Sequence, residues 1–451
     1  MSEPNVLLDA LIEAAGFSHA GFAARVNQRG RQRGLDLRYD HASVARWIRD
    51  RAVPRGCVPE IICEVLSAGI GRAVCLSEAG LDRADMARAG EVPLAEAVDR
   101  AAAVWRGAVR RGLPPAQRPV PGGPAAVSPV FDWENPPDDA HVSSRRGRRS
   151  VAAADVLMVQ EARGRYEQMY RRVGGVPVWP RVIGFLDSQV APLLRGNYDD
   201  AAGRRLMRAA GRLVAVAGIC LYDADRQAAA QRYFFDALRL AKASGDRGFG
   251  GYIVALLANQ SMSLGRYRQV VQYAETALRA AGGWLSPALV SDLCTVQAKA
   301  YARMGDRVRC YEQMRRAETM AGRIQRSQEP PETGYVQRGL VEVQHAEALR
   351  HLGDLAPAQA YAEKALASAQ SSHLRGQVHR FATLAMVLAA RGQVDEAVGV
   401  ADQMLDRVQG MESCRLRERV QAVSGAIAAA GHGAAARQFT QRAADQLATP
   451  I

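Results

Sequence analysis

Arginines concentrated between residues 25 and 55 give the chain its clearest chemical signal. This stretch of 31 residues holds nine arginines and three acidic residues, a net charge of +6, whereas the whole chain of 451 residues carries +13. The planar guanidinium group pairs with phosphate oxygens and with the edge of guanine. Charge alone permits an anionic partner without naming one. The pattern of helices around these arginines, described next, makes double-stranded DNA the partner that we expect.

A helix that positions some of these arginines is predicted over residues 40–51, with Asp40 as its N-cap. Val44, Trp47 and Ile48 have the spacing of one apolar helical face and point inward. The opposite face then carries His41, Ser43, Arg46 and Arg49. Polar side chains on one exposed helical face are what recognition of bases in the major groove requires.

Apolar patterns predict three more helices around this one, near residues 6–12, 18–26 and 58–66. The order is that of a helix-turn-helix domain, whose last helix of the motif enters the major groove. The segment 30–38 is longer than the tight turn of the compact motif. Its arginines are placed to reach the DNA backbone as a wing.

The N-terminal sequence resembles lambda-repressor-like helix-turn-helix domains. The resemblance lies in Phe-Ala-Ala-Arg-Val-Asn at residues 22–27, Ser-Val-Ala-Arg-Trp-Ile-Arg at 43–49, Pro54, and Cys-Leu-Ser-Glu-Ala-Gly-Leu at 75–81. With residues 191–196 and 222–241, the chain resembles actinobacterial regulators that join such a domain to a tetratricopeptide-like half. Some members of that family influence sporulation and antibiotic production.

The resemblance implies roles for six residues of the N-terminal domain. It places three on the face that reads bases: His41, Ser43 and Arg46. It places three nearer the phosphates: Arg25, Arg49 and Arg51. Arg46 is the strongest candidate, because arginine binds guanine through two hydrogen bonds and the neighbouring Trp47 would fix the helix.

A repeat of short turns runs through the C-terminal half. The turns fall at residues 225, 265, 305, 353, 392 and 431, with spacings of 40, 40, 48, 39 and 39 residues. Small residues recur nine places after three of them, at Ala274, Ala362 and Ala401. Such a period is typical of stacked helix–turn–helix units. Leu-Gly-Asp at 352–354 with Ala358, Ala362 and Ala365 resembles tetratricopeptide repeats, although their usual period is 34. The long interval contains residues 328–334, which predict a loop insertion.

Superhelical repeats commonly bind a ligand on their inner face. Aligning the turns places five candidates on first helices of the repeats: Asn259, Lys299, Arg303, Glu347 and Arg350. Lys299 and Arg303, four residues apart, share a face that suits a carboxylate or another anion. Tyr222 and Tyr252 are expected to add flat walls. The ligand class stays open between a peptide, a protein and a small molecule.

A proline-rich stretch at residues 113–150 divides the chain. Proline cannot continue a helix, so we expect a solvated linker there, although Phe131 and Trp133 favour docking onto a folded half. The predicted domains are a helix-turn-helix domain at 1–112, the linker at 113–150, connecting helices at 151–199, and a tetratricopeptide-like solenoid at 200–451. The predicted fold class is all-α.

Motifs for catalysis are missing from the sequence, which has no phosphate-binding GxxxxGK[ST], no HExxH and no GxSxG. We expect no enzyme, no catalytic residues, no cofactor and no metal. The N-terminus lacks the pattern of a signal peptide, and no apolar run reaches the length of a membrane span. We therefore expect a cytoplasmic protein without a membrane partner.

These observations predict a DNA-binding transcriptional regulator of development or secondary metabolism. Its repeat domain would form a homodimer or bind a signal, and so set the availability of two DNA-binding heads. One alternative stays open at this point. The protein is then a scaffold or adaptor that acts through protein–protein contacts of the repeats and does not bind DNA.

Overall fold

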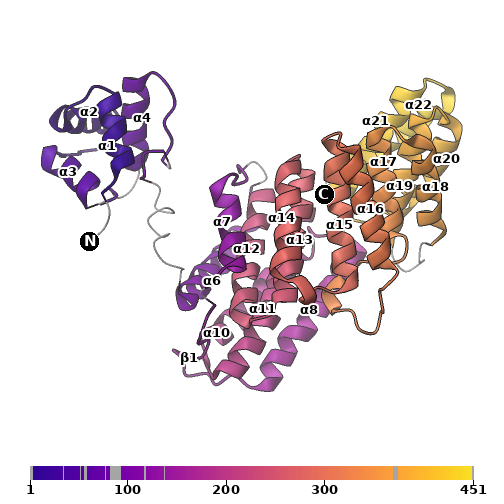
Figure 1. The fold of residues 1–451 in the computed structure, drawn as a ribbon, viewed down its shortest axis with the longest axis horizontal. Coiled ribbons are helices and arrows are strands. Elements are labelled where there is room, and N and C mark those ends of the chain that lie inside the picture. The colour runs from indigo at the N-terminus through magenta and orange to yellow at the C-terminus, as the bar shows by residue number, and fades with distance from the viewer. Residues whose placement is uncertain are drawn as a thin grey trace. The chain divides into compact units, whose positions relative to one another are not determined.

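The computed structural model describes residues 4–33, 35–50, 52–54, 58–76, 78–81, 93–115, 118–136, 138–368 and 374–448. The chain forms two compact units, Met1–Pro93 and Leu94–Ile451. Nearly all regular structure in the described residues is helical (Figure 1), and this confirms the all-α prediction. Arg51 and residues 55–57 and 82–92 lie outside the described residues.

The N-terminal unit contains four described helices: α1 (Val6–Ala14), α2 (His19–Gln32), α3 (His41–Arg49) and α4 (Val58–Ile70). Their apolar faces meet in one core that includes Leu8, Phe22, Val44, Trp47 and Ile61. Side chains cap the first three helices, since Asn5, Ser18 and Asp40 each accept a hydrogen bond from a backbone N–H of the first turn. The predicted N-cap Asp40 is confirmed.

The long connection between α2 and α3 is held in place by α2 itself. The side chain of Asn27 donates to the carbonyl of Tyr39 at 2.7 Å and accepts from its N–H at 2.8 Å. The ring of Tyr39 packs edge-on against Trp47, with centroids 4.9 Å apart. A Cβ on Gly30 would lie 2.3 Å from Leu37, so the glycine makes room for the loop. The loop thus fixes the start of α3.

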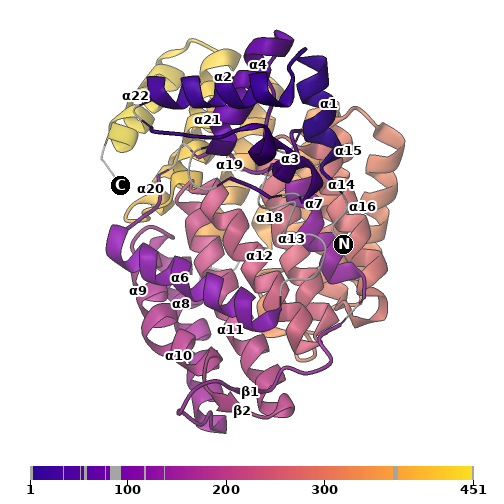
Figure 2. The same ribbon diagram turned by 90° about the vertical axis from the view of Figure 1, so that its left-hand side faces the viewer.

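The described residues of the second unit form six helix pairs, which confirm the tetratricopeptide-like solenoid (Figures 1 and 2). The pairs are α11 (Asp200–Asp223) with α12 (Gln227–Ser244), α13 (Arg247–Ser263) with α14 (Tyr267–Ala280), α15 (Pro287–Arg303) with α16 (Arg307–Ala321), α17 (Leu340–Leu352) with α18 (Leu355–Ala367), α19 (Leu374–Ala390) with α20 (Val394–Val408), and α21 (Cys414–Ala430) with α22 (Ala434–Ala448). All six predicted turns lie between the two helices of a pair.

Backbone conformation explains the turn residues. Gly265, Gly305, Gly353 and Gly392 have φ between 71° and 81°, a region that favours glycine. Asp225 takes the same role in the first pair, with φ of 55°. Ala274, Ala362 and Ala401, the small residues that recur nine places after three of the turns, are fully buried. The period exceeds 34 because most helices are long, up to 24 residues in α11.

The predicted insertion forms a loop that folds back on the earlier repeats. It contains the short helix η4 (Pro331–Thr333) between α16 and α17. Glu332 is buried and accepts from Arg212 of α11 at 2.8 Å, and Tyr335 donates to Asp292 of α15 at 2.6 Å. The insertion therefore covers part of the first helices of the first three repeats.

The prediction of a solvated linker at residues 113–150 is wrong. Helix α7 (Pro124–Glu134) packs against α12 and α14, and the preceding α6 (Leu94–Arg111) packs against α9 (Trp179–Phe185). Proline starts α7 at its first position, where no N–H is needed. Trp133 is buried, whereas Phe131 is exposed. The second unit therefore begins at Leu94, not after the stretch at 113–150.

The remaining described elements lie at the start of the second unit, except η3, which connects α14 to α15. Strands β1 (Ser144–Arg145) and β2 (Asn197–Tyr198) pair antiparallel, with Ser144 opposite Tyr198. The other helices are α8 (Ala153–Val173), η2 (Leu186–Val190), α10 (Ala191–Leu194) and η3 (Gly282–Trp284). In the described part of the chain, no single helix is long and apolar enough to cross a membrane, although the bent pair Val6–Ala14 and His19–Gln32 passes that test by length and composition only.

Candidate nucleic-acid interface and repeat cluster

Helix α3 presents one exposed face and one buried face. Val44, Trp47 and Ile48 are buried in the core of the N-terminal unit, as predicted. The exposed residues of the helix are His41, Ala42, Arg46 and Arg49. These four residues are called the α3 face below. The anchors on the buried side hold it rigidly, because Trp47 packs on both the core and Tyr39.

Ser43 does not belong to the α3 face, which corrects its assignment as a base-reading residue. Its side chain is buried, and its hydroxyl donates to Asp40 Oδ1 at 2.7 Å. The Ser43 N–H donates to the same oxygen at 2.8 Å, and the Asp40 N–H donates back to the hydroxyl at 3.4 Å. These hydrogen bonds form a capping box and lower the pKa of Asp40 below its usual range. Ser43 is therefore the second member of the capping box, and both its hydroxyl and its N–H are engaged there instead of facing DNA.

The predicted arginines differ in what their guanidinium groups contact. Arg46 is exposed and forms no ion pair with any described residue. Arg49 Nε lies 3.1 Å from the neighbouring Asp50, and both side chains are exposed. Arg25 stacks over Phe17, 4.4 Å from the ring centroid, and donates to the carbonyl of Gly21 at 3.2 Å. Of the two arginines of α3, Arg46 is therefore the one whose guanidinium donors are available to bind a partner.

Part of the arginine excess is neutralised inside the N-terminal unit. Glu64 of α4 binds Arg29 at 2.9 Å and also pairs with Arg33. Arg38 pairs with Asp36 in the long loop at 2.8 Å. Sequence spacing could not predict these pairs, because Glu64 is 31 residues or more away from both Arg29 and Arg33. The positive charge that remains available to a partner is therefore smaller than the net charge of +6 counted over residues 25–55.

The repeat candidates meet around one carboxylate, Glu347 of α17. It accepts from Lys299 of α15 at 3.1 Å, from Arg419 of α21 at 2.6 Å and from Thr383 of α19 at 3.5 Å. Burial alone would raise the pKa of Glu347, but the charges of Arg419 and Lys299 hold it well below its usual range. The structure thus brings four first helices together at this point, named the Glu347 cluster below.

Lys299 and Arg303 do not form the free anion clamp that their spacing predicted. The ammonium group of Lys299 is already engaged by Glu347 and Gln344. Arg303 is exposed and lies over Tyr267, 5.8 Å from the ring centroid. Arg350 is half-buried and donates to His351 at 3.2 Å. Burial and the charges of Arg350 and Arg303 lower the pKa of His351 to about 4. Cations thus outnumber carboxylates around Glu347.

The two tyrosines do not form open walls. Tyr252 is buried, and its ring lies 6.2 Å from that of Tyr335 in the insertion. The ring of Tyr222 is covered by Arg415, whose Cζ lies 4.1 Å from the centroid. The Tyr222 hydroxyl bonds to the Asn259 carbonyl at 3.2 Å. The side-chain amide of Asn259 donates within its own helix, to Ala255 at 3.0 Å.

A buried ion pair joins the first repeat to the last two. Asp223 at the end of α11 pairs with Arg375 of α19 and accepts from Ser413 at 2.7 Å. Its other oxygen accepts from the Gly175 N–H at 2.8 Å. Arg375 also lies over Tyr170 of α8, 5.0 Å from the ring centroid. This set, called the Asp223 latch, closes the solenoid across more than 150 residues of sequence, and sequence spacing gave no signal for it.

Similarity to a known family falls on the N-terminal unit. Residues 8–82 match the SP15 N-terminal domain. No curated protein matches the chain. Among solved structures, it is similar to a signal transduction ATPase with numerous domains from Pyrococcus horikoshii that carries a tetratricopeptide repeat sensor. That likeness has 11% identity and a TM-score of 0.36, and it covers 99% of this chain and 66% of the other. This chain therefore spans slightly less than two thirds of that protein, and the repeat architecture described above rests on the helix pairs themselves.

Proposed function

We propose that the protein is a DNA-binding transcriptional regulator whose N-terminal unit reads the major groove with the α3 face. The observation that carries the proposal is Arg46, an exposed arginine without an ion partner among the described residues, on a helix that is capped at Asp40 and anchored by Trp47. A rigid helix that presents a free guanidinium group suits the edge of guanine.

The α3 face also supports a division of roles. Arg46 would donate two hydrogen bonds to guanine, and His41 at the first turn would donate or accept at a neighbouring base. Ala42 is small and exposed, which permits close approach to a thymine methyl group. Arg49 and Arg25 lie on exposed positions where they would contact phosphates. Two residues, His41 and Arg46, are thus left to contact bases, whereas the sequence predicted three, because Ser43 is buried.

The second unit would supply the regulatory input. The excess of cations around Glu347 favours an anionic signal or an acidic segment of a partner, and a homodimer would pair two heads on one operator. The resemblance to actinobacterial regulators supports a role in development or secondary metabolism. In this proposal, a ligand binds one conformation of the second unit more tightly than another, and the resulting shift between conformations changes how readily the N-terminal units bind DNA.

Genome-wide occupancy of the tagged full-length protein tests the proposal. We expect sharp peaks that share a sequence motif, and we expect Arg46→Ala to abolish them. The matched control is Arg72→Ala, which removes one exposed arginine from the segment after α4, where Arg72 pairs with Glu78. Peaks should persist in that variant. Absence of a shared motif for the unmutated protein, with a partner protein co-purifying, would contradict the proposal and favour a scaffold.

A further inference from the structure

Helix α6 separates its charges along its length. Its two carboxylates lie in the N-terminal half and are both neutralised by arginines. Glu96 pairs with Arg100 of the same helix. Asp99 binds Arg146 at 2.6 Å and Arg195 at 2.8 Å, and these pairs keep the pKa of Asp99 below its usual range. No carboxylate of α6 is left to neutralise the second half of the helix.

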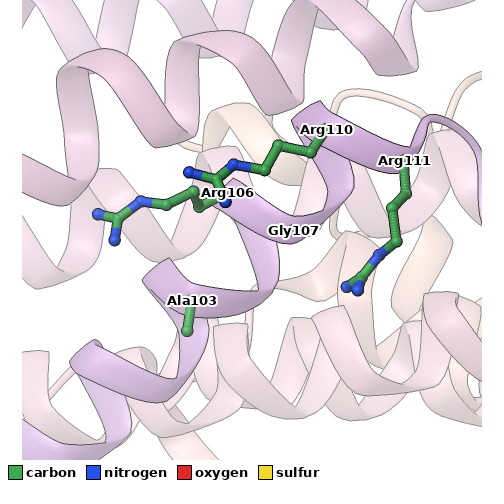
Figure 3. Close-up of a pocket in the computed structure, with 5 residues that line it drawn as sticks. All are labelled: Ala103, Arg106, Gly107, Arg110 and Arg111. Atoms are coloured by element: carbon green, nitrogen blue, oxygen red, sulfur yellow. The ribbon is translucent and has the colours of Figure 1, made fainter.

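The C-terminal half of α6 carries three exposed arginines close to two small residues. Arg106, Arg110 and Arg111 line a shallow hollow together with Ala103 and Gly107 (Figure 3). Arg110 and Arg111 form no ion pair with a described residue, and Arg106 Nε is 3.8 Å from Asp187. In Figure 3 the side chains of Arg106 and Arg110 extend in one direction and that of Arg111 extends away from them. These five residues are called the α6 basic face.

The opposite side of α6 fixes this face in space. Val98, Ala102 and Trp105 are buried in the core of the second unit. Arg106 and Arg110 are one helical turn apart, about 6 Å along the axis. Gly107 has no Cβ, and one built there would lie 2.6 Å from the Arg111 guanidinium, so that guanidinium lies directly over the glycine. The buried side therefore fixes the helix backbone that carries the three cations, and their side chains are exposed to an anionic partner.

We propose that the α6 basic face binds backbone phosphates of the same DNA duplex that the α3 face reads, beyond the recognised bases. The inference rests on the proposed function and extends it to the second unit. Helix α6 begins at Leu94, directly after the N-terminal unit ends at Pro93, so the chain tethers the face to the reading head. Cations that bind phosphates add affinity for every sequence alike and position the protein on the duplex.

The composition of the face favours a nucleic acid over a lipid surface. Interfacial membrane binding needs large apolar side chains beside the basic ones. The other residues that line the hollow are Ala103 and Gly107, and the exposed Val109 of the same helix does not line it. Regularly spaced phosphates are therefore the better partner for this face.

Binding of the full-length protein to labelled duplexes tests the inference. The variant Arg106→Gln/Arg110→Gln/Arg111→Gln removes three charges while keeping good helix formers. The matched control, Arg315→Gln/Arg316→Gln/Arg323→Gln, removes three exposed arginines on and just after α16. Fluorescence anisotropy is measured over a range of salt concentrations with a mixed-sequence duplex of about 40 base pairs and with a duplex carrying the occupancy motif. Circular dichroism confirms that each variant folds.

We expect the triple variant to bind both duplexes about tenfold or more weakly at low salt, and its salt slope to fall by about two to three, as three lost phosphate contacts require. The control should bind like the unmutated protein. A second variant, Ala103→Glu, places a carboxylate among the three arginines without removing them, and we expect it to weaken both duplexes as well.

Three outcomes would overturn the inference, and they differ from one another. If the unmutated protein binds neither duplex, the proposed function fails together with the inference. If the unmutated protein binds and the triple variant matches the control, only the inference fails. If, in that second case, the triple variant also loses the binding to phosphatidylserine-containing vesicles that the unmutated protein shows in a parallel sedimentation assay, the face binds lipid and not DNA.

Discussion

At the scale of single residues, His345 shows how burial without partners makes stability depend on pH. Both ring nitrogens lack a hydrogen-bond partner, and Nδ1 lies 3.6 Å from Glu318. Burial lowers the pKa of His345 to about 4, against the opposing charges of Glu318 and Glu342. Between about pH 6.5 and 4 the unfolded chain therefore binds a proton that the folded chain excludes, and stability falls as the pH falls.

We expect the free energy of unfolding of the second unit to decrease from pH 7 to pH 4, with up to about 3 kcal/mol of the decrease due to His345. Urea unfolding followed by circular dichroism measures it. His345→Phe should flatten the dependence but not remove it, because burial also lowers the pKa of His351 and His379. The matched control is His432→Gln, at an exposed position before α22, which should leave the slope unchanged. An equal slope in all three proteins would contradict this account.

The α3 face shows what residue patterns predicted and what they did not. The spacing of Val44, Trp47 and Ile48 correctly predicted which side of the helix is buried, because burial follows periodicity. The same pattern wrongly assigned Ser43 to the exposed face, because a periodicity argument treats every serine as a polar, solvent-facing residue. Its hydroxyl is used by Asp40 three residues earlier, and only the geometry of the cap shows that.

At the scale of elements, α7 accounts for the error in the predicted linker. A stretch rich in proline and glycine is typical of a linker, but proline at the first position of a helix is favourable, and Trp133 supplies an anchor. Trp133 packs so closely on α13 that a Cβ on Gly250 would lie 2.1 Å from its Nε1. Trp133 was the residue in the sequence that indicated docking, and its burial decides the structure of this stretch despite the surrounding prolines and glycines.

We expect Trp133→Ala to destabilise the second unit by about 3–5 kcal/mol, because it removes a fully buried aromatic side chain. Phe131→Ala is the matched control in the same helix. Phe131 is 59% exposed, and its removal should change stability by about 0.5 kcal/mol or less. The urea midpoint of each variant measures the difference. Equal effects of the two substitutions would show that α7 does not dock.

At the scale of the whole molecule, the Asp223 latch makes the repeats a closed unit, not an open array. Neighbouring repeats pack in sequence order, and the turn spacing predicted that order correctly. The latch adds a contact between the first repeat and the last two. The sequence did not predict it, because it depends on the accumulated rotation from one repeat to the next.

We expect Arg375→Met to destabilise the second unit by about 3–5 kcal/mol, because it leaves the buried Asp223 without its cation. The control is Arg307→Met, which breaks the partly exposed pair between Arg307 and Asp354 of successive repeats; Asp354 keeps its hydrogen bond from Tyr311. That change should cost less than about 1 kcal/mol. Urea unfolding compares the two, and hydrogen exchange at the Gly175 N–H reports opening of the latch. A protected Gly175 in Arg375→Met would contradict the account.

The central claim, that Arg46 of the α3 face reads a base, is tested most directly by affinity for two duplexes. Anisotropy titrations compare the full-length protein, Arg46→Ala and Arg72→Ala on the motif duplex and on a mixed-sequence duplex. We predict that Arg46→Ala weakens binding to the motif duplex by about 1–3 kcal/mol more than it weakens binding to the mixed-sequence duplex, with Arg72→Ala unaffected. Equal losses on both duplexes would make Arg46 a phosphate contact, and no loss on either would contradict reading of DNA by this face.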